Sequence, residues 1–177
     1  VIYNYLIKRN GAIKLKVKTI PHGEITKWIP KVGLRLQVPQ VYQKLKWYGR
    51  GPFETYPDRK TGAKVGIYEK TVAKEYEPYL VPQDYGNKTD VKWMSLTNEE
   101  NVGLFITGEE LFNVSAHQYD TEHLSRANYT YQLEEDNEIT LNIDHKISGV
   151  GGTSISVLNK YRVMPEIYEF TIKILPI

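Results

Sequence analysis

The sequence predicts an all-β protein, built as an antiparallel β-sandwich in a single domain that spans residues 1–177. Short stretches alternate apolar and polar residues and are separated by turn signals, which is typical of half-buried strands. The chain contains 14 tyrosines and 3 tryptophans, and aromatic side chains favour β-structure. Where the alternation is weakest, over residues 60–92, Pro78 and Pro82 exclude a long helix.

The first strands are predicted from the alternation that begins at the N-terminus. Residues 1–6 are apolar and aromatic, and the Asn10-Gly11 pair that follows is a strong hairpin signal. Residues 13–17 then alternate apolar side chains with lysines, and residues 32–38 alternate in the same way. We expect the lysine row to be a solvated strand face that protects a sheet edge against pairing with other chains. This row consists of Lys14, Lys16 and Lys18.

The segment from Trp47 to Arg59 has neither a helical nor a strand period, and we expect an ordered loop across one end of the sandwich. Its glycines and prolines weaken regular backbone pairing, so side chains must hold it in place. We expect Trp47 and Tyr56 to be packed, and Arg50 and Arg59 to pair with carboxylates. The carboxylates nearest in sequence are Glu54 and Asp58. A second interpretation is that this loop borders a binding surface.

The remaining elements follow the same logic. Residues 71–76 fit one helical turn, and Asp120 is placed to cap a short helix that ends at Ala127. The other expected strands cover residues 91–96, 102–106, 111–116, 138–146 and 168–174.

Composition excludes several classes of function. The absence of cysteine rules out a disulfide framework, a thiolate zinc site and a cysteine nucleophile. A net charge of +2 does not favour nucleic acid or an anionic membrane as a partner. No apolar run reaches membrane-spanning length, and the N-terminus lacks the features of a signal peptide. We expect a soluble protein, cytoplasmic or periplasmic, and, because the chain starts within an apparent strand, a fragment of a longer one.

The histidines do not predict a metal site or a cofactor. No two of the four histidines have metal-ligand spacing with supporting carboxylates. His117 with Asp120 or Glu122 fits acid–base chemistry, but a surface ion pair is the more ordinary interpretation of that pattern. The four are His22, His117, His123 and His145.

The glycine-rich run over residues 149–156 has two interpretations. One is a hairpin turn between Ile147 and Val157, since glycine serves tight turns. The other is a close approach of the backbone to a ligand or a neighbouring domain. A nucleotide-binding loop is excluded, because no Gly-Lys-Ser/Thr follows and no parallel βαβ unit surrounds the run.

Four motifs, in the same order along the chain, resemble the C-terminal domain of glycoside hydrolase family 2 β-galactosidases, also called the fifth or small-chain domain. Residues 30–34 resemble P-R-x-G-L, with Lys31 in place of arginine. Residues 47–59 match W-x-G-x-G-P-x-E-x-Y-x-D-R. Residues 82–93 resemble P-Q-E-x-G-x-(R/K)-x-x-x-(R/K)-W, with Asp84 in place of glutamate. Residues 144–151 resemble D-x-x-x-x-G-(V/I)-G.

The resemblance implies a galactose-mutarotase-like supersandwich, truncated at its N-terminus. It also implies a parent enzyme that hydrolyses terminal non-reducing β-D-galactose residues with retention. The two catalytic glutamates of that family lie on a separate (β/α)8 barrel, so this chain contains no catalytic residue. Its role, by the same resemblance, is to pack on the barrel and other domains and to supply a loop to the galactoside pocket.

The resemblance assigns that loop to Gly149, Gly151, Gly152, Thr153, Ser154 and Ile155. Many family members have tryptophan or cysteine after the serine, whereas Ile155 offers an apolar wall without π-stacking. Two alternatives stay open. One is a stand-alone carbohydrate-binding module in which exposed aromatics hold a glycan: Tyr48, Tyr56, Tyr79 and Tyr85. The other is a purely structural domain that completes an interface.

Overall fold

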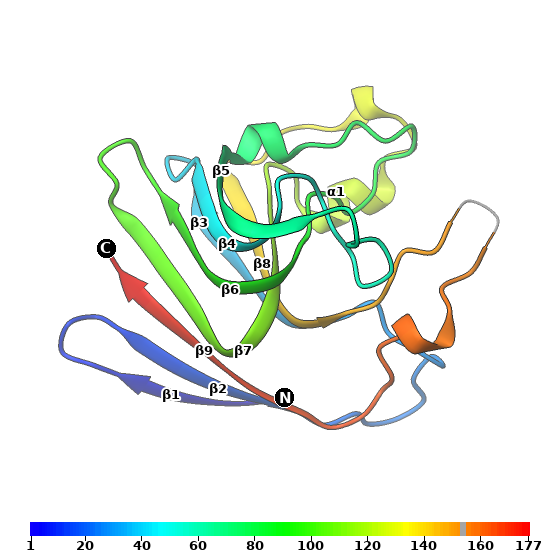
Figure 1. Ribbon diagram of the computed structural model, residues 1–177, viewed down its shortest axis with the longest axis horizontal. Coiled ribbons are helices and arrows are strands. Elements are labelled where there is room, and N and C mark those ends of the chain that lie inside the picture. The colour runs from blue at the N-terminus through cyan, green and yellow to red at the C-terminus, as the bar shows by residue number, and fades with distance from the viewer. Residues whose placement is uncertain (153–154) are drawn as a thin grey trace.

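The computed structural model describes residues 1–152 and 155–177, and within them it is an antiparallel all-β protein (Figure 1). This confirms the predicted fold class. The strands are β1 (Ile2–Ile7), β2 (Ile13–Thr19), β3 (Lys31–Pro39), β4 (Lys44–Gly51), β5 (Lys64–Thr71), β6 (Lys88–Thr97), β7 (Gly103–His117), β8 (Glu138–Ile147) and β9 (Tyr168–Pro176). The helical elements are α1 (Thr121–Arg126) and the 3₁₀ turns η1 (Val72–Glu75), η2 (Thr130–Gln132) and η3 (Asn159–Tyr161).

The sheet is organised around the long strand β7. One path of neighbours runs in the order β1-β2-β9-β7-β6-β4-β5, and β8 with its partner β3 branches from β7. The first part of β7 pairs with β9, whereas residues Asn113–His117 pair with β8. Figure 1 shows β7 curving strongly between these two partners. At Gly108 a side chain would bring Cβ within 2.4 Å of the Glu110 carbonyl, so the bend requires glycine.

A single hydrophobic core fills the space that the curved sheet encloses. It draws alternate side chains from every central strand, as the period of two predicts. Its fully buried members include Leu45, Trp47, Met94, Leu96, Ile106, Ile139, Leu141 and Ile143. Two small elements predicted from the sequence are also confirmed: η1 forms within residues 71–76, and the Asp120 side chain caps α1 by accepting from the Glu122 amide at 2.7 Å.

The signature segment is not wholly a loop, which corrects the sequence-based expectation. Residues 47–51 belong to β4, which lies between β5 and β6. The alternation is present, but glycine occupies two of the buried positions. A Cβ at Gly49 would lie 2.9 Å from the Val91 side chain, and one at Gly51 would lie 2.7 Å from the Tyr68 ring. Only residues 52–59, hereafter the signature loop, leave the sheet.

Strand β5 was not predicted, because it lies in the region that reads as irregular. It is at a sheet edge, paired with β4 alone among the described strands. Val65 and Ile67 face solvent, whereas Tyr68 packs on the Trp47 ring with 5.5 Å between centroids. A strand is predicted from apolar residues that alternate on one buried face. The apolar residues of β5 do not lie on a single buried face, so the alternation did not predict this strand.

The lysine row on β2 faces solvent as predicted, but β2 is not an edge strand. It pairs with β1 on one side and β9 on the other. The lysines form surface ion pairs at 2.7–3.2 Å with Glu109 and Glu169. Such exposed pairs contribute about 0–1 kcal/mol each. The expected role in edge protection is therefore wrong, and the row lines a solvated face in the interior of the sheet.

Candidate functional site

The candidate site lies where the signature loop meets the glycine-rich loop, defined as residues 149–156. The Asp58 carboxylate accepts hydrogen bonds from the Val150 amide at 3.1 Å and the Gly151 amide at 2.8 Å. At Gly149 a Cβ would lie 2.4 Å from Asp58 Oδ2, so a side chain does not fit there. Two segments that are far apart in the sequence thus share one contact. The sequence predicts a structural role for the signature loop and a role in a pocket for the glycine-rich loop.

Hydrogen bonds to the neighbouring backbone fix the base of the glycine-rich loop. The Gly149 amide donates to the Tyr161 carbonyl at 2.8 Å. Gly152 and Ile155 bridge each other at 2.9 and 3.1 Å. This bridge lies within the span from Ile147 to Val157, over which one interpretation of the sequence places a hairpin turn. Ile155 is 68% exposed. The predicted pocket residues Thr153 and Ser154 lie outside the described residues.

Glu54 organises the signature loop. Its carboxylate accepts from Arg59 Nη2 at 2.7 Å, from the Gly86 amide at 3.0 Å and from the Tyr79 hydroxyl. Burial and the adjacent Glu54 carboxylate raise the pKa of Tyr79, which keeps that hydroxyl a donor. The expected ion pair of Arg59 is confirmed, and so is the packing of Tyr56, which is buried.

Arg50 pairs with a carboxylate outside the signature, which sequence analysis did not identify. Its Nε contacts Asp90 of β6, and its Nη1 donates to the Ala63 carbonyl at 2.9 Å. Lys60 Nζ lies 2.9 Å from the same carboxylate. Burial opposes ionisation of Asp90, but the hydrogen bonds from Arg50 and Lys60 outweigh it and lower the pKa of that carboxyl. The buried Trp47 donates from Nε1 to the Arg50 carbonyl at 2.9 Å.

A pocket of about 530 Å³ with a mixed polar and apolar lining opens between the two loops. Its volume lies in the range of small-ligand sites. Its lining combines hydrogen-bond donors, acceptors and one aromatic ring, which suits a polyhydroxylated molecule better than an apolar one. The lining residues are Arg59, Tyr79, Gln83, Asp84, Val150, Gly151 and Gly152.

The two motif positions that depart from the family pattern are partners in space. Lys31 Nζ lies 3.1 Å from Asp84 Oδ2. Lysine carries a single ammonium group where arginine carries a planar guanidinium, and the aspartate side chain is shorter than that of glutamate. The pair therefore keeps its two opposite charges but with different side-chain lengths and hydrogen-bond geometry. Asp84 thus lines the pocket while it is paired with Lys31.

Asp144, the first residue of the last motif, is a buried carboxyl beside this pair. Its Oδ2 has no hydrogen-bond partner within the part of the chain that the structure describes. Burial raises the pKa of Asp144 to about 7, against the opposing charge of Lys31. A Cβ at Gly33 of β3 would lie 2.3 Å from Asp144 Oδ1, so the two strands approach closely here. Asp144 is therefore an ionisable group that the fold holds away from water.

The four tyrosines proposed for a stand-alone sugar-binding module do not form one exposed surface, so that expectation is wrong as a set. Tyr56 and Tyr85 are buried. Tyr48 lies beside Trp93, with 6.3 Å between ring centroids. Tyr79 alone of the four lines the pocket.

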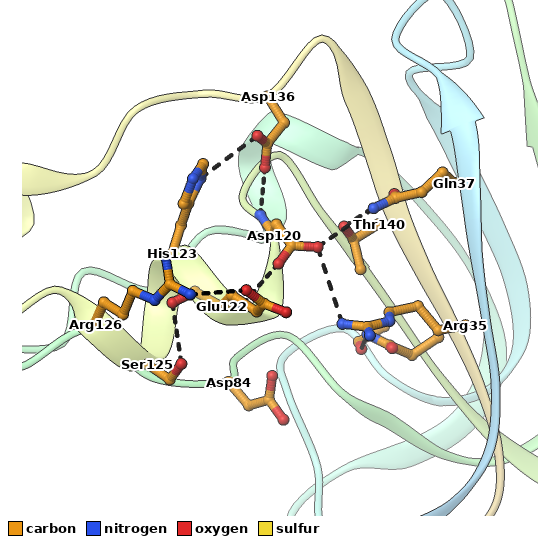
Figure 2. Close-up of polar contacts among 12 residues, drawn as sticks. Arg35, Gln37, Asp84, Asp120, Glu122, His123, Ser125, Arg126, Asp136 and Thr140 are labelled. Carbon is orange, nitrogen blue, oxygen red and sulfur yellow. Dashed lines mark hydrogen bonds and ion pairs between the residues drawn. The ribbon is translucent and has the colours of Figure 1, made fainter.

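Neither the acid–base grouping nor the surface ion pair considered for His117 forms among the described residues. His117 is fully buried, stacked beside Tyr85, and its Nε2 lies 2.8 Å from the Tyr85 carbonyl. Figure 2 shows instead that Asp120 and Asp136 hold the start of α1. Gln37 contacts the Asp120 carboxylate at 3.3 Å. His123 lies 3.4 Å from Asp136. This cluster consists of cap and surface interactions of a short helix.

Across residues 1–152 and 155–177, no group of three or more His, Cys, Asp or Glu side chains is arranged to hold a metal ion. None of the helices in those ranges has both the length and the apolar character that crossing a membrane requires.

The hydrogen bonds of Glu54 give a direct test of the signature loop. We expect Glu54→Gln to lower the free energy of unfolding by about 1–2 kcal/mol, because the Arg59 ion pair and its charge-assisted hydrogen bonds are lost. Urea denaturation measures the change. Glu100→Gln, in the exposed turn after β6, is the control and should have almost no effect. Equal stabilities for the two variants would contradict the role assigned to Glu54.

Comparison with known proteins identifies relatives over nearly the whole chain. A family model described as "Beta galactosidase small chain" matches residues 1–174. A β-galactosidase of Priestia megaterium is 36% identical over 148 residues, which cover 84% of this chain and 14% of the relative. β-Galactosidases of Vibrio vulnificus and Pseudoalteromonas haloplanktis are 35% and 33% identical, over 84% and 95% of this chain. The chain spans only 14–16% of the length of these relatives.

Proposed function

The chain belongs to the β-galactosidase small-chain family, and we propose that it is the C-terminal domain of an enzyme that hydrolyses terminal non-reducing β-D-galactose residues with retention. Two kinds of support carry this proposal. The relatives that match it are β-galactosidases of which it spans a small part. The arrangement of the two loops, with the exposed Ile155 on the same loop as the pocket residues Val150, Gly151 and Gly152, provides a surface that a neighbouring domain can complete.

We place the chemistry outside this chain. Retaining hydrolysis needs two carboxyl groups about 5 Å apart, one as nucleophile and one as acid–base. The pocket carboxylate Asp84 pairs with Lys31, and Glu54 of the signature loop pairs with Arg59. We therefore assign the catalytic pair to glutamates on a separate (β/α)8 barrel. For this chain we propose no catalytic residue and no cofactor.

The contribution of the chain to the reaction is the glycine-rich loop. We propose that Gly149–Ile155 faces the galactoside pocket of the barrel and that Ile155 forms an apolar wall there. The observation that carries this role is that an exposed isoleucine lies on a loop whose base is fixed by Asp58. The apolar side chains that follow provide surface for packing against the barrel and other domains. They include Leu158, Met164 and Ile167, all exposed.

Substitution of Ile155 in the full-length enzyme tests this role. We expect Ile155→Trp to lower KM for lactose and nitrophenyl galactoside about 2–10-fold, because an indole buries more apolar area against a sugar face than an isoleucine side chain does. Ile155→Ser should raise KM. The matched control is Ile67→Trp, an exposed isoleucine of β5, which should leave both constants unchanged. Unchanged KM for both Ile155 variants would contradict the proposed role of the loop.

A separate measurement decides between an accessory domain and a stand-alone sugar-binding module. Calorimetric titration of this chain with galactose and lactose should show no binding tighter than about millimolar, because the pocket lacks the barrel that completes it. Nitrophenyl galactoside should not be turned over. Clear binding without turnover would favour the module, and turnover that follows the protein through repurification would contradict the assignment of catalysis to another domain.

A further inference from the structure

The geometry points to Asp58 as the residue that positions the glycine-rich loop, and so Ile155, for the galactoside pocket. This inference rests on the proposed function and extends it, because the family signature alone places Asp58 in the structural loop. Four features of the described residues carry it: its hydrogen bonds, the space around it, the rigidity of its own backbone and the engagement of its charged neighbours.

The first feature is that one carboxylate holds two successive amides. Val150 donates to Oδ1 at 3.1 Å and Gly151 donates to Oδ2 at 2.8 Å. Hydrogen bonds to an ionised acceptor are about twice as strong as neutral ones. Because each oxygen takes a different amide, the contact fixes both the distance and the orientation of the loop backbone relative to the signature loop.

The second feature is that the loop sequence fits this carboxylate. A Cβ at Gly149 would lie within 2.4–2.8 Å of the three carboxyl atoms of Asp58. Gly151 has a φ of +65°, and a Cβ there would lie 2.5 Å from the Ile155 carbonyl. The first glycine therefore permits the approach to Asp58, and the second permits the chain to return toward Ile155.

The third feature is that Asp58 itself is held on a rigid base. Tyr56 and Arg59 bridge each other through backbone hydrogen bonds of 3.2 and 2.8 Å, with Pro57 and Asp58 at the turn between them. Proline fixes its own φ angle. Just before this turn, the buried Thr55 donates its amide to the Asn87 carbonyl at 2.7 Å. The position of Asp58 is thus set by the sheet through the signature loop.

The fourth feature is that nearby cations are engaged elsewhere. The two cations that follow Asp58 in the sequence are Arg59, which pairs with Glu54 at 2.7 Å, and Lys60, which pairs with Asp90 at 2.9 Å. The Asp58 carboxylate is therefore directed to the loop amides and not to a side-chain ion pair. Its removal should loosen the loop while leaving the core unchanged, because Asp58 is half-buried and lies outside the hydrophobic core.

The experiment uses the full-length enzyme with Asp58→Ala, Asp58→Asn, Gly149→Ala and the Asp58→Ala/Gly149→Ala double variant. Hydrogen exchange at the Val150 and Gly151 amides reports on the contact without depending on catalysis. We expect Asp58→Ala to speed exchange there about 10-fold or more, as loss of roughly 1.4 kcal/mol would give. Asp58→Asn keeps one acceptor oxygen and should have a smaller effect. Glu100→Ala is the control.

The kinetic expectation is a fall in kcat/KM of about 10-fold for Asp58→Ala, carried mainly by KM. Gly149→Ala should cause a similar fall, since its methyl group displaces the carboxylate. The double variant should lose no more than either single variant, because with Asp58 truncated the added methyl group has space. Additive losses in the double variant would overturn the inference.

The outcomes separate this inference from the proposed function. Unchanged exchange in Asp58→Ala would overturn the inference even if Ile155 variants alter KM. Faster exchange with unchanged kinetics, while Ile155 variants do alter KM, would also overturn it, because the loop would then act without this support. If the Ile155 variants also leave KM unchanged, the proposed function of the loop is wrong, and the positioning role of Asp58 is wrong with it.

Discussion

Replacing Asp144 with asparagine is expected to make the chain more stable at pH 8 and to remove most of the fall in stability between about pH 4 and pH 7. The cause is the environment of the carboxyl, which is almost fully buried and has an oxygen without a hydrogen-bond partner among the described residues. Ionising a group in such a place costs desolvation that no local interaction fully offsets. Asparagine has a similar shape and does not ionise.

The direction of the pH effect follows from proton linkage. The pKa of Asp144 is about 7 in the folded chain, compared with an ordinary value of 3.8. Between these values the folded state binds the proton more tightly than the unfolded state, so the free energy of unfolding falls as pH rises. At about 1.4 kcal/mol for each pH unit between the two values, the fall approaches about 4 kcal/mol by pH 8.

Urea denaturation of wild type and Asp144→Asn at pH 5 and pH 8 measures this effect. We expect the gain in stability of the variant over wild type to be about 1–3 kcal/mol larger at pH 8 than at pH 5. Using the difference between the two proteins cancels the titration of other groups. Glu100→Gln should follow the wild-type profile. Parallel pH profiles for wild type and Asp144→Asn would contradict the assignment.

The second large effect is expected when the buried ion pair between Lys88 and Glu75 is broken. Each side chain is 1% exposed. Lys88 Nζ contacts Glu75 Oε2, donates to the Gly86 carbonyl at 3.0 Å and lies 5.1 Å from the centre of the Trp47 ring. Burial lowers the pKa of Lys88, and the neighbouring Glu75 opposes that effect. The pair supports the segment that carries Gly86, which in turn contacts Glu54.

Removing one partner leaves the other charge buried. We expect Lys88→Met to lower the free energy of unfolding by about 3–5 kcal/mol, because the Glu75 carboxylate loses its main compensation. Lys70, whose Nζ lies 3.7 Å from Glu75 Oε1, replaces only part of it. The Lys88→Met/Glu75→Leu double variant removes both charges and should recover most of the loss.

A double-mutant cycle in urea provides the measurement. The matched control is the surface pair of Lys46 and Glu69, which are 3.3 Å apart and about half exposed. Lys46→Met, alone or with Glu69→Leu, should change stability by less than about 1 kcal/mol. If the Lys88→Met/Glu75→Leu variant were as unstable as the sum of its single variants, the buried charges would not be coupled, and the prediction would be wrong.

The same two sites show why sequence analysis found some features and missed others. The charge pair of Lys88 and Glu75 joins a strand to a 3₁₀ turn. Lys88 occupies an (R/K) position of a motif, but the sequence indicates neither its burial nor its partner Glu75. Asp144 is the first residue of a motif, but the sequence does not indicate that its carboxyl group is buried. The local alternation of apolar and polar residues indicates which side chains of a segment face the core. It does not indicate which side chain from elsewhere meets them.

The sequence by itself determined the antiparallel all-β class, most strands, the capped helix at Asp120 and the family. These depend on local periodicity, turn chemistry and motif spacing, which a linear chain displays directly. Tertiary structure alone decided the edge strand β5, the interior place of β2, the Asp90 partner of Arg50 and the contact of Asp58 with the glycine-rich loop. Those features are set by the curvature of β7 and by strand order. Both bring together residues that are far apart in the sequence, and no local pattern indicates that such residues will be in contact.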